Sequence, residues 1–200
     1  KGPAITLAKP RGHESVLDKT LTQNRMDKET LDALLASMRD SFGDFRRYFR
    51  SKAKKLGKNK LAWWDLTAPT GSAELSYSWD EARDFIVSQF GTFTGELADF
   101  ASNAFEKRWI DAEPRDGKTG GAYCMRVPKV DESRILANFD GSFDQVSTLA
   151  HELGHGFHNH CQVGLPRLRS GSPMPLAETA SIFCETIVTN AALGAATEEE

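Results

Sequence analysis

The chain has 200 residues, of which 40% are hydrophobic, 10% aromatic and 26% charged, and its formal net charge is -3. This length allows one substantial hydrophobic core or two small ones. The slightly acidic balance argues against general nucleic-acid binding, and no apolar run is long enough to span a bilayer. We therefore expect a globular protein without a membrane or nucleic-acid partner.

The cysteines and the two ends bear on location and completeness. The three cysteines form no close pair and no CxxC motif. Such a sparse, odd set is typical of a reducing compartment, and the N-terminal residues lack the apolar centre of a signal peptide. A cytoplasmic location is therefore predicted. Because the chain starts with Lys1 and stops at AATEEE, we expect an internal piece of a longer protein.

The first part of the chain has helical periodicity. Apolar residues recur every three or four positions between Asp27 and Lys55, which predicts one long amphipathic helix. Its C-terminal part, from residue 46 to 60, is basic. We interpret this basic stretch as a solvated helix face rather than a nucleic-acid-binding arm, because no aromatic or glycine-rich motif that could contact nucleic acid is interleaved with it. In the following LAWWDLTAP stretch, Trp63 and Trp64 are predicted to be core residues.

A second helical region begins at SWDE. Ser78 precedes Glu81 by three residues, which is the pattern of a capping box. The helix is predicted to run to about Ile110, with an interruption near Gly91 or Gly95. Residues 111–121 (DAEPRDGKTGG) have the composition of a loop.

The last third combines short strands with two helices. Residues 122–128 and 134–139 predict an antiparallel strand pair. Ser142 or Asp144 is expected to cap the next helix, and a final helix is expected from Pro175 past Glu185. The predicted fold class is mainly α, with a small antiparallel β-sheet beside the histidine-bearing helix. Residues 1–115 would form a helical scaffold, and residues 116–200 the strand pair and the metal-binding helices.

Four of the five histidines lie between residues 151 and 160, in HELGHGFHNH. His151 and His155 are four apart, so on a helix both imidazoles share one face and can reach one metal ion. Glu152 is turned by about 100 degrees from His151. It is placed to receive a proton from a water on Zn²⁺, whose pKa is lowered to near neutral. HExxH therefore predicts a zinc site with Glu152 as general base.

A third ligand is needed, because catalytic zinc sites use three protein ligands and one open position. Glu178 lies at the start of the predicted last helix, and Glu185, seven residues on, shares its face. That helix is otherwise apolar and hence expected to be buried, and buried carboxylates need partners. Glu178 is the predicted third ligand, and Glu185 the acceptor that orients an imidazole.

Two other interpretations remain open. The first is a non-catalytic metal-binding module with a closed site, whose fourth ligand would be His158, His160 or Cys161. The second is nucleic-acid binding through residues 46–60, which the net negative charge makes the weakest of the three.

The motifs together resemble a known family. HELGHGFH, preceded by FDGSFDQVSTLA and followed by PLAETASIFCE, resembles the oligoendopeptidase F branch of the thimet-type zinc oligopeptidases. The stretches LDKTLTQNRM, LAWWDLTAP and EKRWIDAEPRDGKTGGAYC also resemble segments of that branch. The resemblance implies an incomplete zincin-like catalytic core of a helical oligopeptidase, binding one Zn²⁺ per chain. Such enzymes cleave oligopeptides inside a deep helical channel.

Carried over to this sequence, the resemblance implies roles for individual residues. His151, His155 and Glu178 would bind zinc, and Glu152 would be the general base and proton shuttle. The cleft would be lined by a strand edge that binds an extended peptide backbone. The residues expected there are Gly121, Ala122, Tyr123 and Ala137.

The chain departs from the family in length. Members place a His and Tyr group that stabilises the oxyanion well after the third zinc ligand, whereas no tyrosine follows Tyr123 here. We expect these residues beyond residue 200. Loss of one oxyanion donor costs about a hundredfold or more in rate. The fragment is therefore expected to be weakly active or inactive, and to self-associate through exposed apolar surface.

Overall fold

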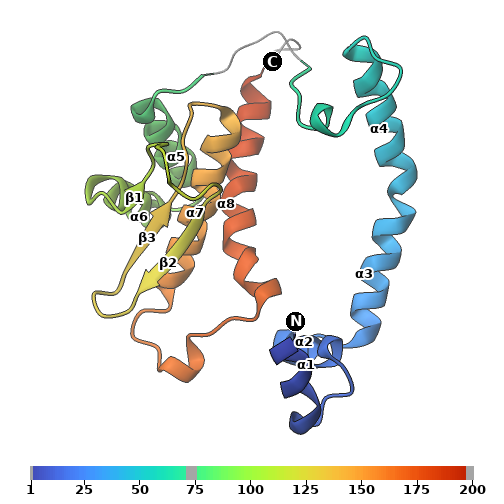
Figure 1. Ribbon diagram of the computed structural model, residues 1–200. Coiled ribbons are helices and arrows are strands. Elements are labelled where there is room, and N and C mark those ends of the chain that lie inside the picture. The colour runs from blue at the N-terminus through green and yellow to red at the C-terminus, as the bar shows by residue number, and fades with distance from the viewer. Residues whose placement is uncertain (1, 71–75, 197–200) are drawn as a thin grey trace. The chain divides into compact units, whose positions relative to one another are not determined.

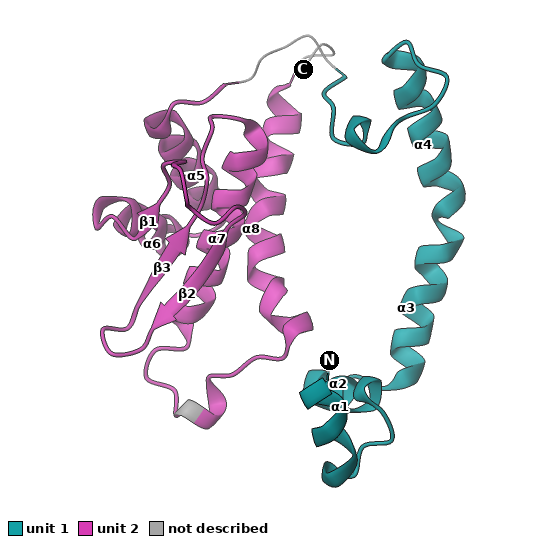
Figure 2. Cartoon of the chain, in the orientation of Figure 1, with its two compact units in different colours: residues 1–72 teal, residues 73–200 magenta. Residues whose placement is uncertain are grey.

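The computed structural model describes residues 2–70 and 76–196, apart from the side chain of Arg167. The chain divides into two compact units, residues 1–72 and residues 73–200 (Figure 2). The second unit includes the two helices between residues 79 and 106 as well as the sheet and the two histidine- and glutamate-bearing helices. The predicted division of one partial catalytic domain into residues 1–115 and 116–200 stays a prediction.

The described residues of the first unit form four α-helices, and α3 and α4 follow one another along a single arm (Figure 1). The predicted single helix from Asp27 to Lys55 is wrong, because Ser41 separates α3 from α4. The Ser41 hydroxyl donates to the Ser37 carbonyl at 2.9 Å. Side-chain bonds of this kind, to a backbone carbonyl one turn earlier, often bend helices. The helices of this unit are α1 (Gly2–Ala8), α2 (Val16–Asn24), α3 (Lys28–Asp40) and α4 (Phe42–Lys55).

A polar turn follows α4. The Ala62 N–H donates to the Asp65 carboxylate at 2.8 Å, and the Lys52 ammonium donates to the Leu66 carbonyl at 2.7 Å. These contacts fix the turn without help from the two indole rings. Trp63 and Trp64 are 85% and 77% exposed. The prediction that they are core residues is wrong.

The second unit begins with two helices, α5 (Trp79–Phe93) and α6 (Gly95–Glu106). The predicted capping box is confirmed, since the Ser78 N–H donates to Glu81 at 2.8 Å and the Glu81 N–H donates back to Ser78. The predicted interruption falls at Thr94, whose hydroxyl accepts from the Leu97 N–H at 3.2 Å. The helical region ends at Glu106, four residues before the predicted end.

The sheet has three strands in the order β1-β3-β2. The strands β2 (Tyr123–Val127) and β3 (Glu132–Leu136) pair antiparallel, as predicted, with Tyr123 opposite Leu136. A third strand, β1 (Ile110–Asp111), pairs parallel to β3, so the sheet is mixed rather than purely antiparallel. Two residues are too few to show strand periodicity in a sequence. Because β3 is central, β2 is an edge strand.

Two long helices complete the second unit. Ser142 caps α7 (Phe143–Cys161) by accepting from the Gln145 N–H, as predicted. The final helix, α8 (Met174–Ala195), begins one residue before the predicted Pro175. α7 packs against α8 on one side and against β2 and β3 on the other (Figure 1). Over the described residues, no helix is long and apolar enough to cross a membrane.

The hydrophobic core of the described residues lies in the second unit. It joins α5 and α6 to the sheet and to the inner faces of α7 and α8. The largest fully buried side chains are Phe90, Ile86, Leu97, Leu149, Leu153, Val146 and Val188. The core therefore holds α7 and α8 in a fixed relation, and the chemistry-bearing side chains project from these two helices.

Candidate metal centre and peptide groove

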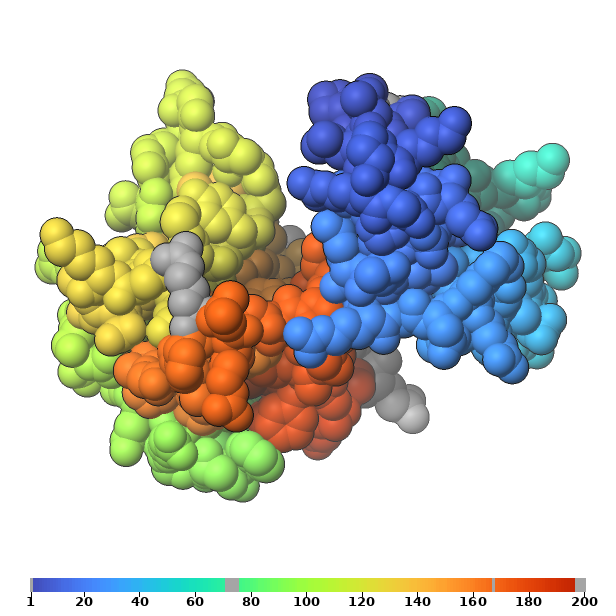
Figure 3. Space-filling view, turned by 90° about the horizontal axis from the view of Figure 1, so that it is seen from below, coloured from blue at the N-terminus to red at the C-terminus, as the bar shows by residue number. Residues whose placement is uncertain are grey.

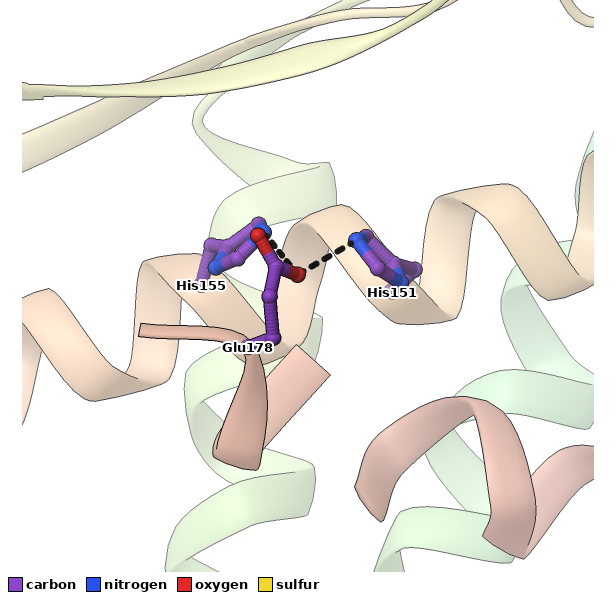
Figure 4. A group of neighbouring side chains, drawn as sticks. All are labelled: His151, His155 and Glu178. Atoms are coloured by element: carbon purple, nitrogen blue, oxygen red, sulfur yellow. Dashed lines mark ion pairs between the residues drawn. The ribbon is translucent and has the colours of Figure 1, made fainter. Parts of the chain in front are cut away.

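Three side chains from α7 and α8 converge on one point. One ligand atom each of His151, His155 and Glu178 lies within 4.8 Å of the others. Glu178 Oε2 is 3.4 Å from His151 Nε2 and 3.4 Å from His155 Nε2. Figure 4 shows the carboxylate between the two imidazoles. The structure thus brings together the three residues predicted as zinc ligands.

The distances from Glu178 to the two imidazoles fit a tetrahedral zinc ion. Ligand nitrogen and oxygen atoms lie about 2.0–2.2 Å from zinc, so two of them in a tetrahedron are about 3.3–3.5 Å apart. The two measured separations of 3.4 Å fall in this range. The donor set of two imidazoles and one carboxylate also suits zinc.

The hydrogen bonds of the imidazoles point to the same conclusion. His151 Nδ1 lies 3.1 Å from Glu185 Oε2, and a carboxylate only accepts, so this nitrogen carries a proton. In the neutral ring, Nε2 then presents its lone pair to the Glu178 carboxylate. A metal ion placed between His151 Nε2 and the Glu178 carboxylate could be bound by both groups. The structure thus places Glu185 in contact with the imidazole that it is predicted to orient.

His155 is held in a similar way. Its ring hydrogen-bonds the backbone of Ala177, at the start of α8. Burial lowers the pKa of His155, although the Glu178 carboxylate opposes this shift. A lowered pKa favours the neutral imidazole, which is the form that binds metal ions.

Glu152 lies beside the cluster and is only 5% exposed. Its Oε2 atom is buried and has no hydrogen-bond partner among the described residues. Burial raises the pKa of this carboxyl, while His151 lowers it and Glu178 raises it further. A buried carboxylate without a partner is costly, so its position calls for a functional explanation.

The remaining candidates for a fourth ligand lie outside the cluster. His158 Nε2 contacts the Gln162 side chain at 2.9 Å, and the His160 ring packs on Phe100 and Phe157. Within the described part of the chain, neither histidine nor Cys161 belongs to a group that could hold the same ion. The fourth position of the site is therefore not filled by these side chains.

Two hollows of about 470 and 430 Å³ adjoin the cluster. Both are lined by Ala122, His151 and Glu152. The larger hollow extends past Tyr123 to Ser172 in the segment between α7 and α8, and the smaller extends past Gly121 to Glu185. The segment between the two helices lies at the surface of unit 2 (orange in Figure 3). We refer to the two hollows together as the groove.

Ala137 differs from the other residues that were predicted to line the cleft. It is fully buried, its N–H donates to the Asp111 carbonyl at 2.9 Å, and its carbonyl accepts from Lys118 at 2.6 Å. Ala137 thus has no free backbone group to offer a peptide. It follows β3, the central strand, whereas the groove lies beside the start of β2.

The backbone that borders the groove is fixed by two side chains. The Lys118 side chain is 2% exposed, and its ammonium donates to carbonyls of Asp111, Glu113 and Ala137. Asn138 donates to the carbonyls of Thr119 and Gly121 at 3.0 and 2.9 Å.

Gly121 completes this stretch with a φ of +82°, a conformation that favours glycine. Together, these contacts hold the start of β2 against the histidines. Cys124, one residue past Tyr123, also lines the larger hollow. Burial raises the pKa of its thiol to about 12, and Cys124 does not belong to the group of described residues that could hold the ion.

Sequence reasoning missed several residues that shape the site. The side chains of Lys118 and Asn138 donate hydrogen bonds to carbonyls up to 19 residues away, and no local sequence pattern indicates such bonds. Gly154 lies inside HExxH, and Ser181 lies three residues after Glu178 on an apolar helix. The sequence signal available for Ser181 was its place as a single serine between Glu178 and Glu185 on this apolar helix.

The chain is similar to known proteins in sequence and in fold. The model of peptidase family M3 matches residues 4–200. An oligoendopeptidase F homolog of Lactococcus lactis subsp. lactis is 27% identical over 187 residues, which cover 93% of this chain and 31% of the relative. One of Mycoplasma pneumoniae is 30% identical over 160 residues, covering 77% of this chain and 26% of the relative.

Solved structures share the fold. A protein of Chlamydophila abortus has a TM-score of 0.75 at 24% identity, over 98% of this chain and 33% of the other. PZ peptidase A has a TM-score of 0.78 at 17% identity, over 91% of this chain and 34% of the other. The chain thus spans about a third of the length of the proteins it matches. On the match over nearly all of its residues, the chain belongs to peptidase family M3.

Proposed function

We propose that this chain carries the metal-binding and proton-transfer residues of a zinc peptidase that hydrolyses oligopeptides. One observation carries the proposal. Three potential zinc ligands converge beside a buried glutamate oxygen that lacks a hydrogen-bond partner among the described residues, and both border the same groove. Membership of a peptidase family supports the same reaction class.

The roles of the residues follow from their positions. His151, His155 and Glu178 would hold one zinc ion, with Glu185 fixing the His151 ring through Nδ1. When bound, the ion would polarise a carbonyl and lower the pKa of a water molecule to near neutral. Glu152 would take the proton of the attacking water on Oε2 and pass it to the leaving amine. Its raised pKa suits a group that accepts and then returns a proton.

The groove suggests how a peptide is held. β2 is an edge strand, so an extended peptide can pair with its free edge and gain main-chain hydrogen bonds. Ala122 and Tyr123 border the hollow next to His151 and Glu152, and this would bring a scissile carbonyl to the metal. Pairing through the backbone gives affinity with little sequence selectivity, which suits oligopeptides of varied sequence.

A second candidate is a metal-binding module without catalysis. It would require a closed coordination sphere, and the fourth position is what separates the two candidates. The test loads the chain with Co²⁺ and adds acetohydroxamate, a small bidentate metal ligand. A shift in the visible absorption is expected for an open position, and an unchanged spectrum would favour the closed module.

Hydrolysis is tested with the zinc-loaded protein and a mixture of unlabelled oligopeptides, with products detected by mass spectrometry after long incubation. The Glu152→Gln variant is expected to keep one zinc per chain and to lose cleavage, because the amide cannot accept the proton. If wild-type chain bound no zinc, or if Glu152→Gln cleaved at the wild-type rate, the proposal would be wrong.

A further inference from the structure

The helices α7 and α8 approach closely beside the predicted metal centre. A Cβ atom placed on Gly154 would lie 2.5 Å from the Ala180 carbonyl oxygen and 2.7 Å from the Ser181 Cα. Real Cβ contacts are not this short, and the obstructing atoms belong to the backbone, which cannot rotate away. Gly154 is therefore the residue that allows α8 to lie against α7 at this level.

Ser181 lies at the same crossing and is fully buried. Its hydroxyl oxygen is 2.9 Å from the Glu178 carbonyl oxygen and 2.9 Å from Glu178 Oε2. A hydroxyl carries a single proton, and neither acceptor can donate. The proton is therefore shared between two oxygens of the same glutamate, and it ties that carboxylate to its own helix.

The oxygen that Ser181 contacts is the one that faces the histidines. Glu178 Oε2 accepts from Ser181 and also lies 3.4 Å from both Nε2 atoms. The Glu178 side chain is 38% exposed, so without this contact it could rotate toward solvent. Fixing a glutamate side chain costs conformational entropy. If the Ser181 contact fixes Glu178 before the metal binds, this entropy cost no longer weakens metal binding.

We propose that Ser181 is a positioning residue that holds the Glu178 carboxylate at the metal position, and that Gly154 makes this possible by admitting α8. The inference rests on the proposed metal site and extends it to a residue that does not touch the ion. Alanine is nearly the same size as serine, so Ser181→Ala removes the hydroxyl while leaving room for the helix crossing.

The experiment measures zinc affinity of the whole chain by competition with a chromophoric chelator. Ser181→Ala is expected to bind zinc about 10- to 100-fold more weakly, the range found when partners of metal ligands are removed. The matched control is Ser133→Ala, which removes another buried hydroxyl, one bonded to Asn159 rather than to Glu178. This control is expected to bind zinc as the wild type does.

Two further readouts separate positioning from general damage. The thermal midpoint of the metal-free Ser181→Ala chain should match that of Ser133→Ala, and its Co²⁺ absorption should differ from the wild-type spectrum. In a Glu178→Ala background, Ser181→Ala should cause no further loss of affinity, because its effect passes through that carboxylate.

The outcomes are distinct. If wild-type chain binds zinc and Ser181→Ala binds it equally well, the positioning role is overturned while the proposed function stands. The same holds if Ser181→Ala weakens binding equally in the Glu178→Ala background. If the wild-type chain binds no zinc, the proposed function fails and the inference fails with it.

Discussion

The two units of the chain show the same sequence pattern with opposite outcomes. In α3 and α4, apolar residues recur every three or four positions, yet Leu34, Met38 and Phe45 are all more than half exposed. In α5 and α6, a similar spacing buries Ile86, Phe90 and Leu97 completely or nearly so. The core of the described residues contains side chains of the second unit alone.

The difference teaches what helical periodicity can and cannot indicate. An apolar stripe predicts that a segment forms a helix with a face to bury, but burial requires another element against that face. The second unit supplies such elements in its sheet, α7 and α8. In the first unit, the described residues include only four buried ones: Ala8, Lys52, Ala53 and Asp65. Stability and the metal centre should therefore depend on the second unit, and the following substitutions test this.

The largest expected effect comes from removing a buried apolar side chain. Leu149→Ala, on the fully buried face of α7, should lower the free energy of unfolding by about 2–5 kcal/mol, because it leaves a cavity. Phe45→Ala, on the exposed face of α4, should change it by about 0.5 kcal/mol or less. Urea unfolding of both variants measures the difference. Equal losses would show that the apolar stripe of the first unit is buried as well.

Replacing a glycine by alanine should destabilise the chain at one position of the second unit and stabilise it at one position of the first. Gly154→Ala forces a Cβ against the Ala180 carbonyl and should destabilise the chain by about 1–3 kcal/mol. Gly43→Ala places its Cβ in open space within α4 and should stabilise that helix by about 0.5–1 kcal/mol. Thermal unfolding followed by circular dichroism checks both. A neutral Gly154→Ala would mean that the helix crossing is looser than described.

A smaller effect is expected from the pH dependence of Glu152. Burial raises its pKa, so the folded chain favours the protonated carboxyl. The destabilisation is absent below the pKa of the unfolded chain and develops as pH rises through the raised folded value. Without metal, Glu152→Gln should therefore melt at a higher temperature than wild type at pH 7, and at a similar temperature near pH 4. Glu29→Gln, at an exposed position of α3, controls for removing a charge. A melting difference that did not depend on pH would contradict this account.

The sequence predicted the local features well because they depend on helix geometry. The spacing of His151 and His155 on one face, the Ser142 cap and the break beside Gly95 all follow from neighbours within about one or two helical turns. The convergence of Glu178 on the histidines was also predicted, from its position near the start of a second helix. Except for this convergence of two helices, each of these inferences used contacts that a helix imposes on its own sequence.

The missed features depend on contacts between distant segments or on competing polar bonds. At the break between α3 and α4 the Ser41 hydroxyl bonds the Ser37 carbonyl, and the exposed Trp63 lies in a turn that polar groups hold. β1 is too short to show periodicity. The contact of Lys118 with Ala137 spans 19 residues, and the role of Ser181 becomes visible only when α8 lies against α7. Such features require the packed structure.

The most direct test of the central claim is a zinc titration of the chain and two histidine variants. His151 belongs to the cluster in the second unit, whereas His13 in the first unit is bonded to Asp18 at 3.1 Å and is the matched control. Wild type and His13→Ala should each bind one zinc ion with the same affinity. His151→Ala should bind at least about 100-fold more weakly, since it loses a ligand itself rather than a partner of one. Equal zinc affinity of His151→Ala and wild type would contradict the account.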